Sequence, residues 1–535
     1  VEGARVAVLA DGAFSTLAVT NAEGEIRAYV PAGTSVSFVV DGRGTGLWTD
    51  LPEGAGAYPP HGAGFVRDLA LESLRDGAEP VPFARGWGWT EGSGPELGLT
   101  PPGTVTLRSG DDLPFEARIS LPAEPSWADP ALVGGYPSGY GALAWARDGQ
   151  VSLLLEPGAY QVTAWRGPRY ETASAAFEVT SGGSVTVDLP LAQAWTPEGW
   201  IQADFHGHAS TSPDAFVPIE DRLVGAAGVG LQVWSASDHD HVVDYSALRD
   251  ALGLAAVLAL NTSEEITPTL RGHLNAWNIQ EDPEAVNGGA YPWWILVPET
   301  TQEQFDRIRA HFPDVVLQAN HPMSGLASIA GWSEGAIADG DHWSSDFDAV
   351  EVLNGGVVGR AVDFYLDLVS RGILVAPTGT SDSHDWLGAG LSFTWIGAGT
   401  SDPADLDAGL IAQAIRQRRT IASNGPFLSM DPEPGSEVIG PFTLEVRALG
   451  PSWIAVDTLT LYENGVPVAS TPGSAATFEV VPVEDAAYVV VATGSKPMSP
   501  VSAATGWALA SAILADADGN GWTPPLPPLE VTGGR

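Results

Sequence analysis

The chain has 535 residues, of which 44% are hydrophobic, and this length exceeds what a single core normally holds, so several domains are expected. Its 66 acidic and 24 basic residues give a formal charge of −42, which argues against nucleic acid or anionic membrane as a partner, because polyanions attract Lys and Arg. The lack of cysteine excludes disulfides, thiolate ligands and cysteine nucleophiles, and no apolar stretch reaches the ~20 residues that a membrane helix needs.

The charge and the start of the chain also bear on location. An excess of carboxylates is typical of secreted or salt-exposed proteins, which it keeps soluble. The chain starts at Val1 without methionine, which fits either a processed export signal or a trimmed chain. We therefore expect a secreted or periplasmic protein without membrane insertion; the sequence predicts no oligomeric state.

The first part of the chain is punctuated by Gly and Pro and contains short alternating runs, such as residues 24–30 and 184–189, which predict β-strands. A Pro-rich stretch, residues 79–102, separates two modules. We therefore expect an N-terminal β-rich domain over residues 1–90 and a second, β-sandwich-like domain over residues 91–195. Strands of the second domain are predicted at residues 105–107, 151–155 and 160–164.

The pattern changes near Trp195, where apolar strands begin to alternate with helical segments. The predicted strands are residues 230–235, 254–260, 314–318, 349–353 and 372–375. The predicted helices are residues 219–227, 301–311, 361–371 and 404–419. This alternation predicts a parallel sheet or barrel over residues 196–425. A C-terminal β-rich domain follows over residues 426–535, with strands at residues 443–447, 459–463 and 488–492.

Polar residues that can carry chemistry follow the apolar runs of the middle domain, where a β/α barrel places its catalytic groups. His206-Gly207-His208 follows residues 201–205 and puts two imidazoles on one side of an extended segment. Alone, this motif fits solvated histidines as well as a metal ion. Six of the ten histidines, however, occupy such positions, and structural histidines would not collect there. The other groups at run ends are His239, Glu264, Glu265, His273, His321, Asp382 and His384.

At these residues the chain resembles a known family. The phrases D-F-H-G-H, S-D-H-D, E-E-I-T with G-H-L-N, N-H-P, E-V-L-N-G and T-S-D-S-H, in this order from Asp204 to His384, resemble the PHP (polymerase and histidinol phosphatase) superfamily. The flanking β-modules and the phrases at residues 166–171 and 423–427 are similar to its CehA/McbA-like branch. The resemblance implies a multidomain fold in which a distorted seven-stranded β/α barrel is flanked by N- and C-terminal β-sandwich-like domains.

The resemblance also implies a metal-dependent hydrolase that holds two or three divalent ions. His206, His208, Glu265 and Asp382 would hold the first ion, and Glu265 would bridge to a second held by His273 and His321. Asp214, His239 and His384 would hold a third. Ala209 and Ser263 depart from the usual pattern without removing a ligand, and the neighbour Glu264 leaves the choice of bridging carboxylate open.

Two cations that share a carboxylate lower the pKa of a bound water, so that hydroxide can attack a phosphorus or carbonyl centre near neutrality. Imidazole and carboxylate ligands suit Zn²⁺, Mn²⁺ or Fe²⁺. A site bridged by a carboxylated lysine is excluded, because the only lysine, Lys496, lies outside the predicted barrel of residues 196–425. We expect a small-molecule phosphate ester as substrate. The alternatives are a carboxylic or carbamate ester hydrolase of the CehA/McbA type, and an exported glycan-binding or adhesive protein with a relic barrel.

Weaker signals complete the set of candidates. His241 could donate a proton to the leaving group or hold the loop, and Arg271 could bind a substrate anion or be solvated. Glu351 and Asn354 could orient ligands, touch substrate or form a turn. Residues 516–521 begin like a calcium loop, but the position of the bidentate glutamate is Pro527, so a polar turn is the better interpretation.

Overall fold

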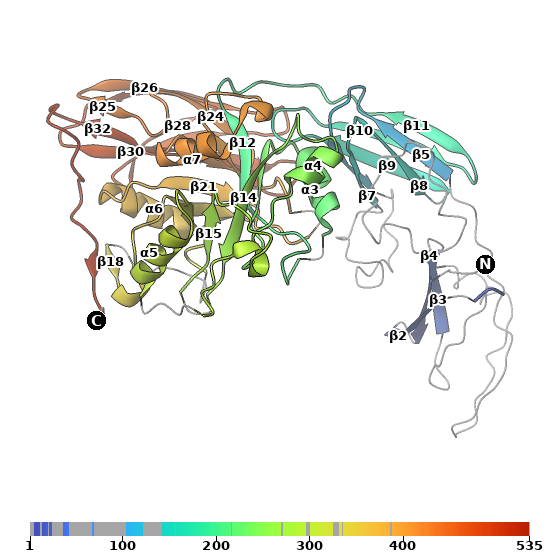
Figure 1. Ribbon diagram of the computed structural model, residues 1–535. Helices are drawn as coiled ribbons and strands as arrows, with labels where there is room; N and C mark the ends of the chain where they lie inside the picture. The colour runs from blue at the N-terminus through green and yellow to red at the C-terminus, as the bar shows by residue number, and fades with distance from the viewer. Residues whose placement is uncertain are drawn as a thin grey trace. The chain divides into compact units, whose positions relative to one another are not determined.

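The computed structural model of this protein describes residues 5–10, 13–19, 21–23, 36–41, 67–68, 103–120, 142–155, 157–215, 217–268, 271–295, 300–324, 331–333, 335–385 and 388–533. The fold is rich in β-structure, with several sheets and few helices in this part of the chain (Figure 1). It divides into two compact units, Val1–Ala164 with Ala173–Leu191, and Trp165–Thr172 with Ala192–Arg535. The four domains expected from the sequence stay a prediction.

The first unit begins with a four-stranded antiparallel sheet in the order β2-β1-β3-β4. Its strands are β1 (Arg5–Ala10), β2 (Ala13–Val19), β3 (Val36–Asp41) and β4 (Arg67–Asp68). The strand predicted at residues 24–30 and the Pro-rich stretch at 79–102 lie outside the described residues.

Two further sheets of this unit share one core. The sheets have the orders β10-β9-β6-β7 and β11-β5-β8. Their strands are β5 (Gly103–Arg108), β6 (Phe115–Ser120), β7 (Ala142–Ala146), β8 (Gln150–Leu155), β9 (Gly158–Trp165), β10 (Ala173–Val179) and β11 (Ser184–Asp188). Residues from both sheets, such as Val105, Phe115 and Val162, form one buried cluster. Along β5 buried residues alternate with partly exposed ones, as expected for a strand with one face on a core.

The second unit is built on a large mixed sheet that carries the candidate site. Seven of its strands are β12 (Ile201–Gly207), β13 (Val233–Ala236), β14 (Ala259–Ile266), β15 (Leu274–Trp277), β16 (Val316–Ala319), β19 (Ala349–Asn354) and β21 (Ala376–Thr380). They pair in this order, each with the next. β15 is antiparallel to both neighbours, whereas the other pairs are parallel.

The segment that follows β21 returns to β12. Asp382 donates its N–H to the carbonyl of His206 at 2.7 Å, and His208 donates its N–H to the carbonyl of Ser383 at 3.0 Å. Gly207 and Ser383 form a parallel bridge. The last of the seven strands is therefore joined at its end to the first, although about 170 residues separate them in the sequence.

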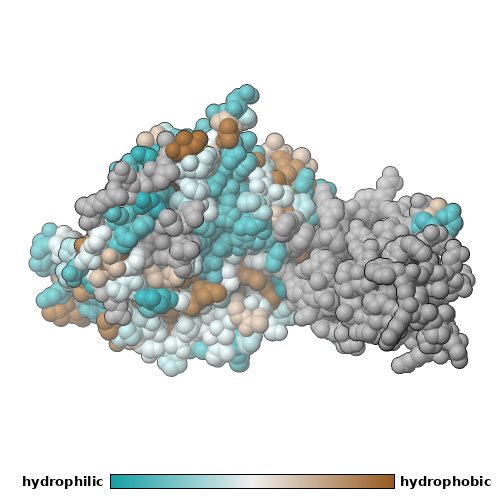
Figure 2. Space-filling view, turned by 90° about the horizontal axis from the view of Figure 1, so that it is seen from below, coloured by the Kyte–Doolittle hydropathy of each residue, from teal (hydrophilic) through white to brown (hydrophobic). Residues whose placement is uncertain are grey.

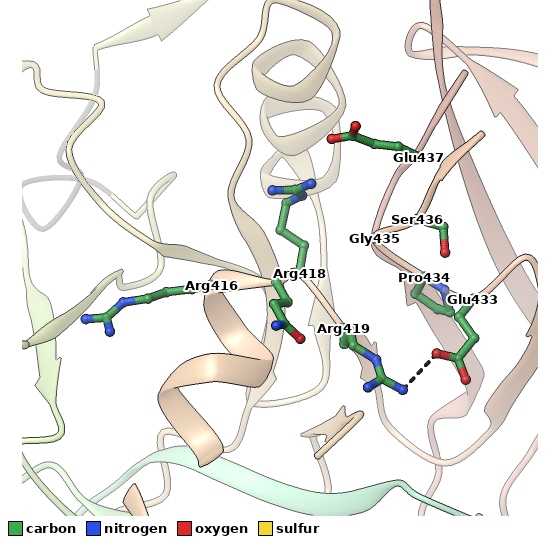
Figure 3. Close-up of a pocket in the computed structure, with 9 residues that line it drawn as sticks. Arg416, Arg418, Arg419, Glu433, Pro434, Gly435, Ser436 and Glu437 are labelled. Atoms are coloured by element: carbon green, nitrogen blue, oxygen red, sulfur yellow. Dashed lines mark hydrogen bonds and ion pairs between the residues drawn. The ribbon is translucent and has the colours of Figure 1, made fainter. Parts of the chain in front are cut away.

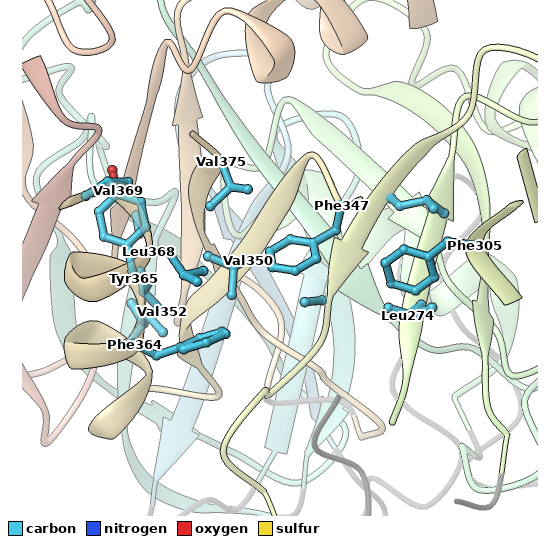
Figure 4. Packing of buried hydrophobic residues seen from close by; sticks show 14 of the residues in the cluster. Leu274, Phe305, Phe347, Val350, Val352, Phe364, Tyr365, Leu368, Val369 and Val375 are labelled. Carbon is cyan, nitrogen blue, oxygen red and sulfur yellow. The ribbon is translucent and has the colours of Figure 1, made fainter. Parts of the chain in front are cut away.

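Helices cover this sheet, namely α3 (Ile219–Gly228), α4 (Ser246–Ala251), α5 (Thr301–His311), α6 (Arg360–Ser370) and α7 (Ala408–Arg416). α6 turns an apolar face that includes Phe364, Tyr365 and Leu368 inward (Figure 4). These side chains belong to one buried cluster with Val350 and Val352 of β19. Burial of large apolar side chains at 0–1% exposure holds the helix on the sheet.

The sheet continues beyond β12 through the C-terminal part of the chain. Its further strands are β20 (Val357–Val358), β22 (Phe393–Ile396), β23 (Thr420–Ser423), β25 (Glu437–Ile439), β27 (Thr458–Glu463), β28 (Val466–Pro472), β30 (Ala486–Pro497), β31 (Thr505–Ala510) and β32 (Ile513–Asp516). β24 (Phe427–Asp431), β26 (Phe442–Leu449) and β29 (Ala475–Val480) form a three-stranded sheet. Another consists of β17 (Trp332–Ser333), β18 (Ala336–Ile337) and β33 (Glu530–Val531).

Several predicted bounds are wrong. Residues 372–375 form no strand, and β21 starts at Ala376. Residues 254–258 form no strand, with a turn at 255–257, and β14 begins at Ala259, so Glu265 lies inside the strand rather than after it. The helix predicted at 404–419 is a 3₁₀ turn, Pro403–Asp405, followed by α7.

The surface of the described part suits an acidic chain. On the face that Figure 2 shows, hydrophilic and intermediate residues predominate among the coloured ones, with smaller hydrophobic groups between them. Among the described residues no helix has the length and apolarity that crossing a membrane requires.

Candidate metal centre

The site starts at the adjoining ends of β12 and β21. Asp204, fully buried in β12, accepts the N–H of His206 at 3.2 Å and the N–H of Ser381 at 3.1 Å with Oδ1. Together with the backbone bonds between the two segments, this carboxylate fixes the chain on both sides of the site. Burial raises the pKa of Asp204 to about 6, against the effect of these hydrogen bonds.

Four side chains from these segments and β14 converge in what we call the inner cluster, His206, His208, Glu265 and Asp382. Asp382 Oδ1 lies 3.2 Å from Nε2 of His206 and 3.3 Å from Nε2 of His208. The same nitrogens lie 3.3 and 3.6 Å from the oxygens of Glu265. Both nitrogens are buried without a hydrogen-bond partner among the described residues.

A cation shared by the four side chains would account for this arrangement. Ligand atoms at about 2.0–2.1 Å from a tetrahedral Zn²⁺ lie about 3.3 Å from one another, which matches the spacing of the inner cluster. Buried nitrogens without partners are costly in a folded protein unless something binds them. The residues of the inner cluster therefore fit a divalent metal ion.

Glu265 connects the inner cluster to three more imidazoles. Its Oε1 lies 3.0 Å from Nδ1 of His273 and 3.5 Å from Nε2 of His321, and its Oε2 lies 2.9 Å from Nδ1 of His239. Two sets of potential ligands result, one with His206 and His321 and one with His239 and His273. The second ion expected from Glu265, His273 and His321 stays a prediction: both rings face Oε1 of Glu265, and His321 falls in the first of these sets and His273 in the second.

A fourth set, the outer cluster, consists of His208, Asp214, His239 and His384. Asp214 Oδ2 lies 3.1 Å from Nε2 of His239 and 3.2 Å from Nε2 of His384. The rings of His208 and His384 stack with centroids 4.1 Å apart. The structure thus brings all nine predicted ligands into overlapping sets; their role as ligands stays a prediction.

The buried carboxylates and imidazoles of the site shift one another's pKa values. Burial opposes ionisation of Glu265, but His206 and its other imidazole neighbours outweigh it and hold its pKa well below the usual range. Burial likewise opposes a charge on His206, yet Asp382, Glu265 and Glu351 raise its pKa well above 6.5. The same balance, with Glu265 and Asp214, raises the pKa of His239 to about 9. Without metal, imidazolium groups neutralise the carboxylates.

Glu351 supports the ligands from β19. Its fully buried carboxylate lies 2.6 Å from Nδ1 of His206 and accepts the N–H of His321 at 2.6 Å. Asn354, one of the predicted catalytic residues, donates Nδ2 to Glu351 at 3.0 Å and to Asp382 at 3.2 Å. The structure therefore places Asn354 beside the inner cluster and Glu351 behind it.

The other two predicted catalytic residues belong to none of the four sets. Arg271 donates Nη1 to the carbonyl of Asp341 at 3.0 Å. His241 is half-buried, and its N–H lies 3.3 Å from the carbonyl of Asp238. Their catalytic roles stay predictions.

Several residues that hold ligands in place were not among the predicted site residues. Ser212 Oγ lies 3.2 Å from Nδ1 of His208 and donates to Asp214 at 2.9 Å, and Thr267 Oγ1 lies 2.6 Å from Nδ1 of His239. Asn320 donates to Oε1 of Glu265 at 2.9 Å. Asn320 could have been found from its place beside His321, whereas Ser and Thr are too common in loops to stand out.

Three residues at the site have a positive φ although none is glycine. They are Asp240 (52°), His321 (26°) and Asp382 (48°). This left-handed region is unfavourable for residues with a Cβ, and such strain collects at functional sites. At His321 and Asp382 this backbone conformation belongs to a residue whose side chain is a potential ligand of the site.

Two other charged features lie apart from these sets. A pocket of about 460 Å³ is lined by residues that include Arg416, Arg418 and Arg419 (Figure 3). Arg419 forms an ion pair with Glu433 at 2.7 Å, and Arg416 donates to the carbonyl of Asp314 at 2.8 Å. Two of the three arginines that line the pocket therefore already have partners.

Asp485, Asp516 and Asp518 form the second feature, in the segment compared above with a calcium loop. Asp516 accepts the N–H groups of Gly519 and Gly521 at 2.8 Å, which is the hydrogen bonding of a polar turn.

Comparison with known proteins adds one resemblance. The chain is similar to a two-domain protein from Bacteroides vulgatus that contains a predicted PHP-like metal-dependent phosphoesterase, with 17% identity and a TM-score of 0.33 over 59% of this chain and 97% of that one. No protein-family model matches the sequence, and no curated protein matches it either. Function is therefore inferred from the site.

Proposed function

We propose that this protein is a metal-dependent hydrolase of the PHP type that uses a metal-activated water on phosphate esters. The observation that carries the proposal is the inner cluster. Two buried Nε2 atoms, which have no hydrogen bond to any described residue, face carboxylate oxygens at 3.2–3.6 Å, the spacing expected of ligands around one divalent ion. Three further sets share Glu265 or His208 with it, so the proposal includes two or three ions.

We also propose that the seven strands from β12 to β21 form the distorted barrel of that superfamily. Their consecutive pairing and the bonds that join Asp382 and Ser383 to β12 support this. The ligands follow from that topology, because side chains at strand ends converge on one mouth of a barrel. Assignment to the CehA/McbA-like branch belongs to the same proposal.

Divalent ions at such a site supply a hydroxide near neutral pH and neutralise the charge that develops on the substrate oxygen. Glu265 presents one oxygen toward His273 and His321 and the other toward His239 and His208, so its carboxylate would help to hold ions on both sides. Asn354 holds the Asp382 carboxylate by donating to Oδ2, which leaves Oδ1 facing the two imidazoles. We assign the proton for the leaving group to His241 and the substrate anion to Arg271.

The test combines metal content and turnover. Chelator-treated protein is reloaded in turn with Zn²⁺, Mn²⁺ and Fe²⁺ and assayed on aryl phosphates, aryl phosphodiesters, aryl carboxylic esters and aryl carbamates. We expect metal-dependent turnover of a phosphate ester. Turnover of carboxylic esters or carbamates alone would replace the phosphate assignment, and inactivity on all four classes by the reloaded enzyme would refute the hydrolase.

Two histidine variants make the test specific. His206→Ala should lose both bound metal and activity, because His206 belongs to two of the sets. His342→Ala is the matched control, since His342 pairs with Asp339 away from these sets. Unchanged metal content in His206→Ala would show that the inner cluster does not hold an ion.

The remaining expectations are part of the proposal. We propose that the substrate is a small molecule, that the four-domain division holds, and that the protein is secreted or periplasmic. The charge of −42 supports exclusion of nucleic acid as a partner. A glycan array with metal-loaded protein separates an enzyme from an exported binding protein with a relic barrel.

A further inference from the structure

Arg222, on α3, is a buried cation beside the candidate site that neither the sequence motifs nor the ligand sets include. Its side chain is 2% exposed. Within the described residues its hydrogen bonds go to backbone carbonyls, from Nε to His208 at 2.8 Å and from Nη2 to Ser383 at 3.1 Å and Asp385 at 3.0 Å. Burial lowers the pKa of Arg222 to about 10, which leaves it charged at neutral pH. Burying a charged guanidinium is costly, so its position calls for a role.

The three carbonyls belong to the segments that carry His208, which both clusters share, and His384, which belongs to the outer cluster alone. One is His208 itself, and the other two flank His384 in the sequence. The carbonyl of Ser383 also accepts the N–H of His208 at 3.0 Å, so Arg222 joins a backbone contact that already links the segments. The imidazole rings carried by these segments lie against each other: those of His208 and His384 stack with centroids 4.1 Å apart and an interplanar angle of 21°.

The outer cluster depends on such support more than the inner cluster does. The side chains of His206 and Glu265 are 0% and 1% exposed, whereas those of Asp214 and His384 are 49% and 33% exposed. Exposed ligands lose more conformational freedom when they bind an ion than ligands already fixed by packing. A contact that orders the backbone of His208 and His384 in advance reduces that loss.

We propose that Arg222 is a positioning residue that determines whether the outer cluster binds a divalent ion. The proposal rests on the proposed metal-dependent function and adds to it a selective effect on one ion. Without Arg222 the carbonyls of His208, Ser383 and Asp385 lose a buried donor, and the two segments are free to shift by the fraction of an ångström that separates a good ligand set from a poor one.

The experiment measures how many ions bind and how tightly. Wild type, Arg222→Met, Arg222→Lys and His384→Ala are stripped, titrated with Co²⁺ while the visible absorption is followed, and analysed for metal after dialysis against Zn²⁺. We expect Arg222→Met to match His384→Ala, with the ion of the outer cluster bound about 10- to 100-fold more weakly or lost and the inner ions affected much less. Arg222→Lys, which keeps the charge but not the fork of donors, should fall between.

Arg309→Met is the matched control. Arg309 also donates to backbone carbonyls of this unit, those of Val315 and Asp346, but it contacts neither ligand-bearing segment. It should bind metal like the wild type. If Arg222→Met retains the stoichiometry and affinities of the wild type, the inference is overturned.

Three other outcomes also test the inference about Arg222. If Arg222→Met fails to fold by circular dichroism, Arg222→Lys becomes decisive, and wild-type binding by that variant overturns the inference. If the wild type binds no more ions than His384→Ala, the outer cluster is not a metal site and the inference fails while the inner cluster stands. A wild type that binds no metal at all would instead refute the proposed function.

Discussion

Glu351 Oε1 lies 2.6 Å from Nδ1 of His206, and both side chains are fully buried. The same carboxylate accepts from Gln318 and Thr380 on one oxygen and from His321 and Asn354 on the other. A histidine whose second nitrogen faces a carboxylate is held in one orientation and is a more basic ligand. Glu351 therefore sets the direction in which His206 presents Nε2 to the inner cluster.

We expect Glu351→Gln to weaken metal binding about 10- to 100-fold. A glutamine amide would place a donor opposite groups that already donate, so at least one of these contacts becomes repulsive. Metal affinity by competition with a chromogenic chelator measures the effect. Glu116→Gln, a buried glutamate of the other unit that accepts from Arg118 and Trp145, is the control and should leave the affinity unchanged.

Metal affinity should rise with pH between about 6 and 9. His206 and His239 have raised pKa values, about 9 for His239, so in the metal-free protein both hold protons that an ion must displace. Raising the pH removes this competition. Calorimetric titration with Zn²⁺ in two buffers of different ionisation enthalpy should show release of about one to two protons at pH 7. Binding that releases no protons would contradict the assignment of these two imidazoles.

Stability of the metal-free protein should fall as the pH rises from about 4.5 to 8, in part because of Glu264. Its buried Oε2 has no hydrogen-bond partner among the described residues, and burial raises its pKa to about 8. In this window the folded state holds a proton that the unfolded state has lost, so each increase in pH favours unfolding.

Glu264→Gln removes this dependence and should be stabilising at pH 8.5, by at most about 5 kcal/mol. Thermal unfolding at pH 5.5 and 8.5 measures it, with Glu284→Gln, at an exposed position, as the control. Equal losses of melting temperature across this range in Glu264→Gln and the wild type would show that Glu264 is ionised in the fold.

Phe364→Ala should destabilise the second unit by about 3–5 kcal/mol, because it leaves a cavity between α6 and β19 where a fully buried ring now packs (Figure 4). Denaturant unfolding followed by tryptophan fluorescence reports the change. Val483→Ala, at a position with 92% exposure, should alter stability by less than about 0.5 kcal/mol.

The sequence predicted the site better than the elements that carry it. Polar motifs at the ends of apolar runs identified eight of the nine residues that the structure gathers into sets, and the family resemblance added Asp214. The run Leu254 to Leu258 was mistaken for strand, because turn residues that bury apolar side chains follow no period. The strand that does form, β14, contains Asn261, Glu264 and Glu265, whose polar character hides it.

The antiparallel direction of β15 could have been predicted. Between Ile266 and Leu274 there is no room for the crossover of a dozen or more residues that a parallel strand requires. The position of Arg222 beside the site could not have been predicted from the sequence. Arg222 donates to backbone carbonyls of residues 14 to 163 positions away, and every residue type offers such a carbonyl.

The bonds between β12 and the segment after β21 have a consequence for biosynthesis. Until residues 376–385 have left the ribosome, the end of β12 that bears His206 and His208 has β13 on one edge and no partner on the other, and an exposed strand edge of this kind invites aggregation. Nascent chains that stop short of Ser383 should therefore bind metal poorly and should depend on chaperones, and tight metal binding should begin only once β12 has gained its second neighbour.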